Sequence, residues 1–279
     1  MVINGKEVSS KIKDDLKQEI KSLNDKITLC VVQVGNDEAS NVYIRQKEKA
    51  SNELGIEFLH MKYDESISEN ELEDEIVKLN SNDKITGMII QLPIPKKFNT
   101  NKLINLIDSN KDVDGLTDEN KVKLYNNEDC IVPCTPLGVL ELLNYYNIDV
   151  KGKNVVIIGR STLVSKPLFN LLLNKDATVT ICHSKTIDLP SITKTADILI
   201  SAVGKPNLVT EDMVKDNAVV IDIGINRVDG KLCGDVDYSN VCDKVSYITP
   251  VPGGVGPMTV AMLMKNTLTA YKKTKKLVR

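Results

Sequence analysis

Five short apolar runs in the second half of the chain constrain its fold most. Each is about as long as a buried strand and too short for a typical helix, and helical segments separate some of them. Strands that are buried on both faces, with helices between them, predict a doubly wound parallel sheet. The runs are "NVVIIG" (154–159), "ATVTIC" (177–182), "DILISAVG" (197–204), "AVVIDIG" (218–224) and "VSYITPV" (245–251).

The first half of the chain alternates helix and strand in the same way. Apolar residues at helical spacing predict a helix from about Val8 to Leu23, and Ser68 with Glu71 forms a capping box before another. We therefore predict an α/β fold throughout, with parallel strands buried on both faces. The predicted strands are 28–35, 56–63 and 85–95, and the other predicted helices are 39–54, 68–80 and 102–107.

An irregular segment, 108–134, interrupts this alternation and is typical of a domain junction. After it, Thr135 as N-cap and Pro136 at the first helical position predict a new helix. We expect one domain over 1–134 and a second over 135–255. The last helix, from about Gly256 to Lys273 within 256–279, is expected to pack back on the first half.

The bulk properties narrow the function. The chain has 279 residues and a net charge of −2, which favours neither a nucleic-acid nor a membrane-surface partner. It contains no apolar run of about 18 residues and its start is unlike a signal peptide, so we expect a cytoplasmic protein. The six cysteines include no C-x-x-C pair and there are only two histidines. We therefore expect reduced thiols and no metal site.

One lysine stands out in the helix predicted over 39–54, which has Asp37 as a plausible N-cap and Gly55 as a plausible stop. Ala39, Tyr43, Lys47, Ala50 and Leu54 share one face at helical spacing, and only Lys47 among them is charged. Lys47 could lay its stem along the face with its charge in water. Alternatively, partial burial could lower its pKa and make it a catalytic group. The helix alone leaves both readings open.

A turn after the first strand of the second half, "VVIIGRSTLVSKP" (155–167), suggests a nucleotide site. Compared with the dinucleotide fingerprint G-x-G-x-x-G, only Gly159 remains, with Ser161 and Val164 at the other two glycine positions. By itself, this match is equally compatible with a simple strand-turn-helix connection.

The residues near this turn favour NADP over NAD. Arg160 lies inside the turn of a chain that has 32 lysines and only four arginines. The second strand ends at His183, Ser184, Lys185 and Thr186, where an NAD site usually has an acidic residue for the ribose. Arginine, hydroxyls and a further cation suit the 2′-phosphate of NADP. His183 could equally be a loop histidine with no role.

Seven motifs occur together and in order: "VGNDEASNVYIRQKEKA", "GMIIQLPIP", "KDVDG", "PCTPLG", "GRSTLVSKP", "VIDIGIN" and "TPVPGGVGPMTVAML". With them, nearly the whole chain resembles the bifunctional methylenetetrahydrofolate dehydrogenase/methenyltetrahydrofolate cyclohydrolases. The resemblance implies a folate-binding α/β domain and a Rossmann-like NADP-binding domain with a cleft between them. It also implies a homodimer that forms through the nucleotide domain.

The resemblance assigns roles to residues of the first half. It implies that Lys47 is the catalytic lysine, that Tyr43 lines the folate site one turn earlier, and that Gln91 partners and tunes Lys47. It further implies that Asp114 binds the pterin edge. A carboxylate suits that edge, since two adjacent N–H donors can face its two oxygens.

The resemblance also assigns roles in the second half. Gly159, Arg160, Ser161, Ser184 and Ile225 fall on NADP positions. The glycines of "PGGVGPMT" would let the backbone approach a ligand at a helix N-terminus. The positions there that border cofactor and substrate are Gly253, Gly256 and Thr259.

The chain departs from the family pattern at three positions. Ser165 replaces a glycine in the nucleotide turn, where we expect a small change in loop packing with the cofactor site intact. Ser109 stands where a proline is common and Leu116 where an aromatic residue is common. These two bear on the exact position of the Asp114 loop.

The implied function is oxidation of 5,10-methylenetetrahydrofolate by NADP+, followed by hydrolysis of the methenyl product to 10-formyltetrahydrofolate. One rival is a single-activity dehydrogenase of the shikimate-reductase type, which would leave Lys47, Gln91 and Asp114 together unexplained. Another is a protein that binds folate or NADP without turnover, which an assay distinguishes.

Overall fold

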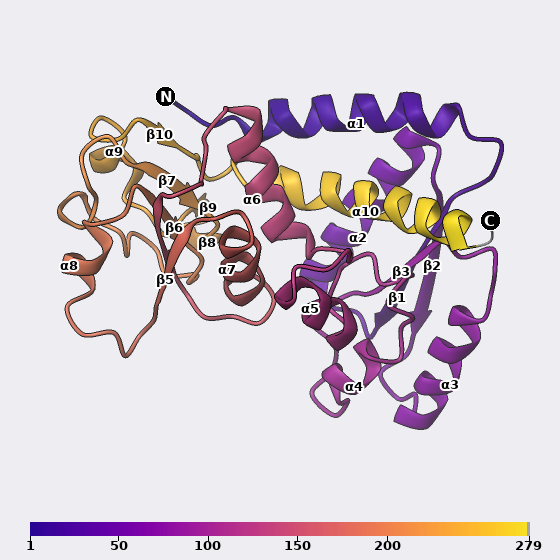
Figure 1. Ribbon diagram of the computed structural model, residues 1–279. Helices are drawn as coiled ribbons and strands as arrows, with labels where there is room; N and C mark the ends of the chain where they lie inside the picture. The colour runs from indigo at the N-terminus through magenta and orange to yellow at the C-terminus, as the bar shows by residue number, and fades with distance from the viewer. Residues whose placement is uncertain (278–279) are drawn as a thin grey trace. The chain divides into compact units, whose positions relative to one another are not determined.

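The computed structural model describes residues 1–277. The chain forms two compact units, and neither is continuous in sequence. We call them the three-stranded unit (Lys11–Cys134 and the chain from Val260) and the five-stranded unit (Met1–Ser10 and Thr135–Thr259). Helices α1 (Gly5–Lys21) and α10 (Gly256–Leu277) each contribute residues to both units (Figure 1). The predicted α/β class is confirmed.

The sheet of the three-stranded unit is parallel, with the order β2-β1-β3. Its strands are β1 (Thr28–Val34), β2 (Glu57–Tyr63) and β3 (Gly87–Ile90). The crossover helices are α2 (Glu38–Leu54) and α3 (Glu69–Asn80). The chain moves outward from β1 to β2 and then back past β1 to β3, so two right-handed crossovers place α2 and α3 on opposite faces of the sheet.

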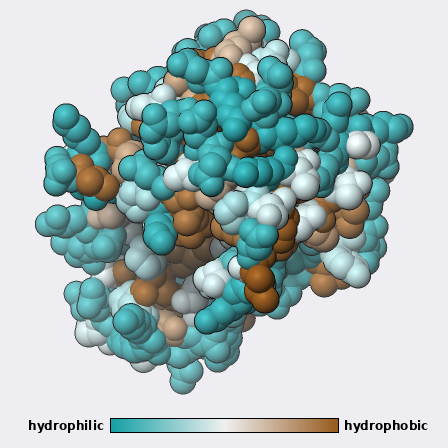
Figure 2. Space-filling view, turned by 90° about the vertical axis from the view of Figure 1, so that its left-hand side faces the viewer, coloured by the Kyte–Doolittle hydropathy of each residue, from teal (hydrophilic) through white to brown (hydrophobic). Residues whose placement is uncertain are grey.

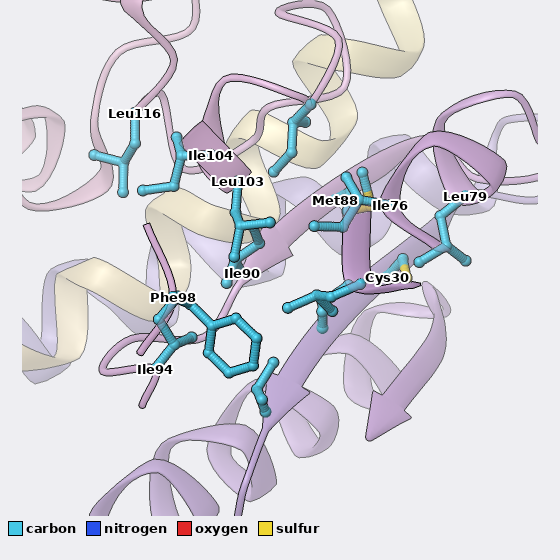
Figure 3. Packing of buried hydrophobic residues seen from close by; sticks show 14 of the residues in the cluster. Cys30, Ile76, Leu79, Met88, Ile90, Ile94, Phe98, Leu103, Ile104 and Leu116 are labelled. Atoms are coloured by element: carbon cyan, nitrogen blue, oxygen red, sulfur yellow. The ribbon is translucent and has the colours of Figure 1, made fainter. Parts of the chain in front are cut away.

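The core on the α3 face follows from the period of two in the strands. Cys30, Val32 and Val34 of β1 point to this face and pack in one buried cluster with α3 and the segments after β3 (Figure 3). Leu116 belongs to this cluster and is 8% exposed. The leucine at this departure from the family pattern is therefore part of the core.

The predicted caps of α2 and α3 are confirmed, whereas α1 spans Gly5–Lys21 and so begins and ends earlier than predicted. The Asp37 side chain accepts a hydrogen bond from the Ser40 backbone N–H, and Gly55 ends α2 in the left-handed conformation with φ of 78°. Ser68 and Glu71 form the predicted capping box of α3. The short helix α4 spans Thr100–Ile104, slightly earlier than predicted.

The prediction of an irregular junction over 108–134 is wrong in one part. The segment contains the helix α5 (Asp118–Tyr125), which begins after Thr117 as N-cap. Its apolar pattern is too weak to be recognised, because the helix is short and only Asn120 and Leu124 are buried.

The five-stranded unit contains a parallel sheet with the order β10-β7-β6-β4-β5. The strands are β4 (Asn154–Ile158), β5 (Thr178–Cys182), β6 (Ile198–Ser201), β7 (Val219–Asp222) and β10 (Tyr247–Ile248). The helices are α6 (Cys134–Tyr145), α7 (Ser165–Leu173), α8 (Leu189–Thr193), η1 (Glu211–Met213) and α9 (Tyr238–Val241). The chain runs from β4 to one neighbour, β5, and then to the other, β6. A topological switch point therefore lies between β4 and β6, at the carboxyl ends of the strands.

Three expectations for secondary structure need correction. The strands β2 and β5 lie at sheet edges and are partly exposed, so they are not buried on both faces. Helix α6 begins at Cys134, so Thr135 lies inside the helix and is not its N-cap, and Pro136 is not the first helical residue. A two-stranded antiparallel hairpin, β8 (Asn226–Val228) with β9 (Lys231–Cys233), was not predicted, because its strands have only three residues each.

The face shown in Figure 2 is mostly polar, with apolar side chains gathered in one part of it. All six cysteines are unpaired. Within residues 1–277, no helix is both long and apolar enough to span a membrane.

Candidate active site

Lys47 and Gln91 meet in the three-stranded unit. The Lys47 Nζ atom donates to Gln91 Oε1 at 2.8 Å, and Gln91 Nε2 donates to the Leu92 carbonyl oxygen at 2.7 Å. The backbone N–H of Gln91 donates to the Val32 carbonyl oxygen, which continues the pairing of β3 with β1. The amide of Gln91 therefore has a fixed orientation, with its oxygen toward the amine.

Burial changes the proton affinity of the groups around this pair. It lowers the pKa of Lys47 from its ordinary value of 10.5, and the nearby Asp114 carboxylate opposes that shift. Burial also raises the pKa of Asp114, which the Lys47 ammonium in turn opposes. The thiol of Cys134 hydrogen-bonds to Asp114 and has its own pKa raised by burial. Lys47, Gln91, Asp114 and Cys134 thus form one electrostatically linked cluster.

The Asp114 loop is held by a buried polar network. Asp112, 1% exposed, accepts from the Thr117 backbone N–H at 2.8 Å and from Asn120 Nδ2 at 3.0 Å. Asn120 Nδ2 also donates to the carbonyl oxygen of Ser109 at 2.9 Å. The carbonyl of Ser109, the second departure from the family pattern, is therefore bonded within the network that fixes this loop.

A second support comes from the last helix. Asn266 of α10 is 3% exposed, and its Nδ2 donates to the carbonyl oxygens of Val113 and Val132, both at 2.9 Å. A Cβ atom at Gly115 would lie 2.7 Å from the Ile131 carbonyl oxygen, so only glycine lets the two segments lie against each other. The amide of Asn266 therefore fastens the Asp114 loop to the chain before α6. The sequence analysis assigned no role to Asn266 or to Gly115, although Gly115 is the glycine of the "KDVDG" motif.

The predicted apolar stripe on α2 is only partly buried. Ala50 and Leu54 are buried, but Ala39 is exposed and Tyr43 is 45% exposed. The true buried face is rotated toward Ser40, Ile44 and Ser51, so Lys47 lies at its border. That border position leaves Lys47 half-buried, while the phenol ring of Tyr43, one turn earlier, remains accessible.

The predicted nucleotide turn joins β4 to α7. Gly159 has φ of 130°, and a Cβ atom there would lie 2.6 Å from the Ala202 carbonyl oxygen. The Ser161 Oγ accepts from the backbone N–H groups of Val164 and Ser165 at 3.1 and 3.2 Å, which holds the turn directly before α7. Ser165 is fully buried, and its hydroxyl has no hydrogen-bond partner in the structure.

The residues expected to select NADP directly follow the ends of two paired strands, β4 and β5. Ile158 of β4 pairs with Cys182 of β5, and Arg160 and Ser184 each follow two residues later with exposed side chains. No carboxylate within residues 1–277 forms an ion pair with Arg160. His183 is half-buried, and its Nδ1 accepts from the Lys185 backbone N–H at 3.1 Å. This hydrogen bond closes the turn that contains Ser184, so His183 has a structural role there.

Ile225 follows β7 at the same edge of the sheet and is 52% exposed. Beneath it lie two buried carboxylates, Asp222 and Asp235, which sequence reasoning missed. Burial raises the pKa of Asp222 to about 6, although backbone N–H donors act in the opposite direction. The available signal was an aspartate at the end of an otherwise apolar strand.

The segment before α10 also belongs to the five-stranded unit. Gly253 is buried and its carbonyl oxygen accepts from the Lys6 backbone N–H at 3.2 Å. Gly256 is the first residue of α10 and is exposed. The Thr259 and Thr135 hydroxyls lie 3.2 Å apart. The structure therefore brings Lys47, Gln91 and Asp114 together in one unit, and holds the predicted cofactor residues and the 253–259 positions in the other.

Two family models match the chain in sequence order. Residues 3–114 match the catalytic domain of tetrahydrofolate dehydrogenase/cyclohydrolase, and residues 133–275 match its NAD(P)-binding domain. The chain belongs to the tetrahydrofolate dehydrogenase/cyclohydrolase family. The NAD(P)-binding match runs into α10, whereas α10 from Val260 belongs to the three-stranded unit.

Individual members of the tetrahydrofolate dehydrogenase/cyclohydrolase family agree with this assignment over their full length. The bifunctional protein FolD of Nautilia profundicola is 52% identical, covering 100% of this chain and 99% of the relative. The crystal structure of the FolD methylenetetrahydrofolate dehydrogenase/cyclohydrolase from Campylobacter jejuni has a TM-score of 0.96 at 46% identity, with 98% and 99% coverage. The Trypanosoma brucei FolD structure, complexed with NADP cofactor and inhibitor, has a TM-score of 0.92 at 35% identity, with 98% coverage of both chains.

Proposed function

We propose that this chain catalyses two consecutive reactions of one-carbon metabolism. It oxidises 5,10-methylenetetrahydrofolate to the 5,10-methenyl form with NADP+, and it then hydrolyses the methenyl group to give 10-formyltetrahydrofolate. The observation that carries the proposal is the Lys47–Gln91 hydrogen bond beside Asp114, in a chain whose two halves both match the family.

Lys47 handles protons in the hydrolysis. Its lowered pKa increases the fraction of neutral amine, which can accept a proton from water as the water oxygen bonds to the methenyl carbon. The resulting ammonium can return a proton to N5 as the bond between that carbon and N5 breaks, and the remaining hydroxyl proton is released to solvent as the formyl carbonyl forms. Gln91 contributes by holding the amine in place through its oriented side-chain oxygen.

Asp114 and Tyr43 bind the substrate in this proposal. The carboxylate of Asp114 accepts hydrogen bonds from the amino-pyrimidine edge of the pterin, and its loop is held from two sides by Asp112 and Asn266. The exposed ring of Tyr43 packs on the flat substrate. Gly253, Gly256 and Thr259 complete the set of proposed substrate contacts.

The residues after β4, β5 and β7 fit NADP. A side chain at Gly159 would collide with backbone, as expected for a turn that a dinucleotide approaches closely. Arg160, Ser161 and Ser184 would hold the adenosine end, with the exposed guanidinium on the 2′-phosphate, and Ile225 would line the nicotinamide end. His183 would support the Ser184 turn. When bound, NADP+ supplies the hydride acceptor.

We assign 1–134, together with 256–279, to the folate-binding domain and 135–255 to the NADP-binding domain. The boundary at residue 134 is supported by the two family matches and the two compact units, and the placement of α10 from Val260 by the compact units alone. Residues 1–10 are the exception, since they lie in the five-stranded unit. We also propose a cytoplasmic homodimer that forms through the NADP-binding domain, where the edge strand β5 carries partly exposed side chains along most of its length.

The test is absorbance-monitored turnover. The purified chain is given methylenetetrahydrofolate with NADP+ or with NAD+, and separately methenyltetrahydrofolate without cofactor. We expect NADPH formation, slower reduction of NAD+, and loss of the methenyl absorbance faster than in buffer. Binding of folate or NADP+ without turnover would refute the proposal in favour of a binding protein.

A further inference from the structure

Two carboxylates lie buried at the carboxyl edge of the five-stranded sheet. Asp222, at the end of β7, is 3% exposed and Asp235 is fully buried. The proposed function gives neither of them a chemical step or a contact with a ligand. Burial of two carboxylates is costly unless each is well hydrogen-bonded, so their partners indicate what they stabilise.

Asp235 fixes the loop that follows β6. Its carboxylate accepts from the backbone N–H groups of Val203, Gly204 and Lys205 at 2.8, 3.2 and 2.8 Å. Three consecutive N–H groups that converge on one carboxylate leave this loop a single conformation. The Ser201 hydroxyl, at 2.9 Å, completes the attachment to β6.

Asp222 fixes the next loop and also Asp235 itself. It accepts from the backbone N–H groups of Gly224 at 2.9 Å, Asp235 at 3.0 Å and Val236 at 2.9 Å. Asn226 Nδ2 in turn donates to Asp235 at 3.0 Å. Ile225 thus lies between Gly224, which donates to Asp222, and Asn226, which donates to Asp235.

Two glycines make room for the carboxylates. A Cβ atom at Gly224 would lie 2.1 Å from the Asp235 carboxylate, and one at Gly234 would lie 1.9 Å from that of Asp222. Both positions exclude any side chain without displacement of an acid. The segments "DIGIN" (222–226) and "GD" (234–235) therefore pack tightly against each other.

The two loops held in this way border the switch point. The Ala202 backbone N–H donates to the Ile158 carbonyl oxygen at 2.8 Å, directly before the nucleotide turn. A dinucleotide whose adenosine end lies over β4 and β5 extends across the crevice toward β6 and β7. Its nicotinamide end then reaches the loops that carry Val203 and Ile225.

We propose that Asp235, supported by Asp222, is a positioning residue for hydride transfer, because it sets the two loops that receive the nicotinamide end of NADP+. This inference rests on the proposed function. Asp235 acts through the loops and not on the reacting atoms. Its loss should therefore impair the reaction that uses NADP+ and spare the hydrolysis, whose proposed proton-handling groups all belong to the three-stranded unit.

The test compares Asp235→Asn with Asp229→Asn. The amide keeps the shape of the acid but presents an N–H group to backbone donors, whereas Asp229 is exposed in the hairpin turn and carries the same charge. We expect Asp235→Asn to lower the dehydrogenase kcat/KM for NADP+ by roughly tenfold or more, mainly through KM. Cyclohydrolase activity on methenyltetrahydrofolate without cofactor should stay within about twofold. Asp229→Asn should change neither activity.

A milder variant keeps the proposal testable if Asp235→Asn does not fold. Asn226→Ala removes one of the five hydrogen bonds to Asp235 from a half-buried position and should raise KM for NADP+ by roughly threefold. Parallel loss of both activities, or an unchanged KM for NADP+ in Asn226→Ala, would overturn the proposal. If the parent chain itself fails to reduce NADP+, the proposed function fails instead.

Discussion

The two units differ in whether the proposed functional residues are buried or exposed. In the three-stranded unit, the residues proposed to act on the substrate are themselves half-buried, which lowers the pKa of Lys47 and raises that of Asp114. In the five-stranded unit, the proposed cofactor contacts Arg160, Ser184 and Ile225 are exposed, and the buried acids lie beneath the loops. Proton transfer needs a group whose pKa has been adjusted, whereas hydride transfer needs mainly a placed acceptor.

This difference predicts how substitutions will separate the two activities. Changes that alter a buried reactive group should affect the hydrolysis strongly. Changes at exposed cofactor contacts should affect only the KM for NADP+. Substitutions of the buried residues beneath the cofactor loops should alter the stability of the fold or the placement of NADP+, and they should leave the hydrolysis unchanged.

The largest effect is expected for Lys47→Met, which keeps the side-chain length and removes the amine. Cyclohydrolase activity should fall by roughly 10²-fold or more, the usual scale for a positioned acid–base group. Dehydrogenase activity should fall less, because hydride transfer has no proton step at its centre. Methenyltetrahydrofolate should then accumulate, which absorbance detects directly.

Lys49→Met is the matched control, since the Lys49 side chain is 80% exposed on the same helix. It should leave both activities unchanged. Hydrolysis at the parent rate in Lys47→Met would mean that Lys47 only lays its stem along the helix and that another group activates the water.

The next effect concerns cofactor choice. Arg160→Ala should raise the KM for NADP+ by roughly 30- to 150-fold, which corresponds to the loss of about 2–3 kcal/mol from a charge-assisted hydrogen bond. The KM for NAD+ should change far less, because NAD+ lacks the 2′-phosphate. Initial rates with both cofactors measure the ratio, and Arg227→Ala, at another exposed arginine of the same unit, serves as control. Equal effects on both cofactors would remove Arg160 from the 2′-phosphate site.

Asp114→Asn should weaken folate binding by roughly tenfold, since the amide replaces one acceptor with a donor. Calorimetric titration with a folate ligand measures this change. Both activities should fall together, in contrast to Lys47→Met, because both reactions use the same bound substrate. Unchanged binding would reduce Asp114 to a structural residue of its loop.

The pH dependence provides a finer test of the same pair. In the proposed mechanism the neutral Lys47 amine accepts the proton, so the hydrolysis rate should rise with pH through a midpoint below 10.5. The Asp114 carboxylate raises the pKa of Lys47, so Asp114→Asn should move that midpoint to lower pH. The rate at saturating substrate, measured across pH in both proteins, gives the two midpoints. A midpoint that stays in place or rises would separate Asp114 from Lys47.

The smallest effects are expected at two serines of the nucleotide turn, and they have opposite signs. Ser165→Ala removes a buried hydroxyl that lacks a partner and should stabilise the fold by about 1 kcal/mol. Ser161→Ala removes the hydroxyl that accepts from the backbone N–H groups of Val164 and Ser165, and it should destabilise the fold by about 1 kcal/mol. Urea denaturation measures both. A loss of stability in Ser165→Ala would mean that its hydroxyl is bonded in solution.

Much of the fold could be predicted because its signals are local. The apolar runs identify the parallel strands, and Asp37, Gly55 and Ser68 mark helix ends through contacts within a few residues. Helix α5 and the hairpin β8–β9 were missed because short elements leave almost no periodic pattern. The start of α6 was misplaced by two residues, because Thr135 and Pro136 resemble an N-cap and a first helical residue, whereas the helix begins at Cys134.

The candidate site could be predicted only where residues themselves carry a chemical signature. Lys47 is conspicuous as a charge on an otherwise apolar face, and Arg160 as a rare arginine in a turn. Asn266 and Asp235 carry no such signature, because their role consists of contacts with segments that are distant in sequence. Asn266 meets Val113 across 153 positions, and no local pattern encodes that distance.

The attachment of Asn266 to the Asp114 loop has a consequence for biosynthesis. Translation proceeds from the N-terminus, so a nascent chain contains Lys47, Gln91 and Asp114 long before the residue that fastens their loop has been made. The folate-binding half therefore cannot finish folding while it leaves the ribosome, although its sheet can form early. Truncated chains that end before residue 266 would contain Lys47 but lack the side chain that fastens the Asp114 loop, so we expect full activity only after the last helix has been translated.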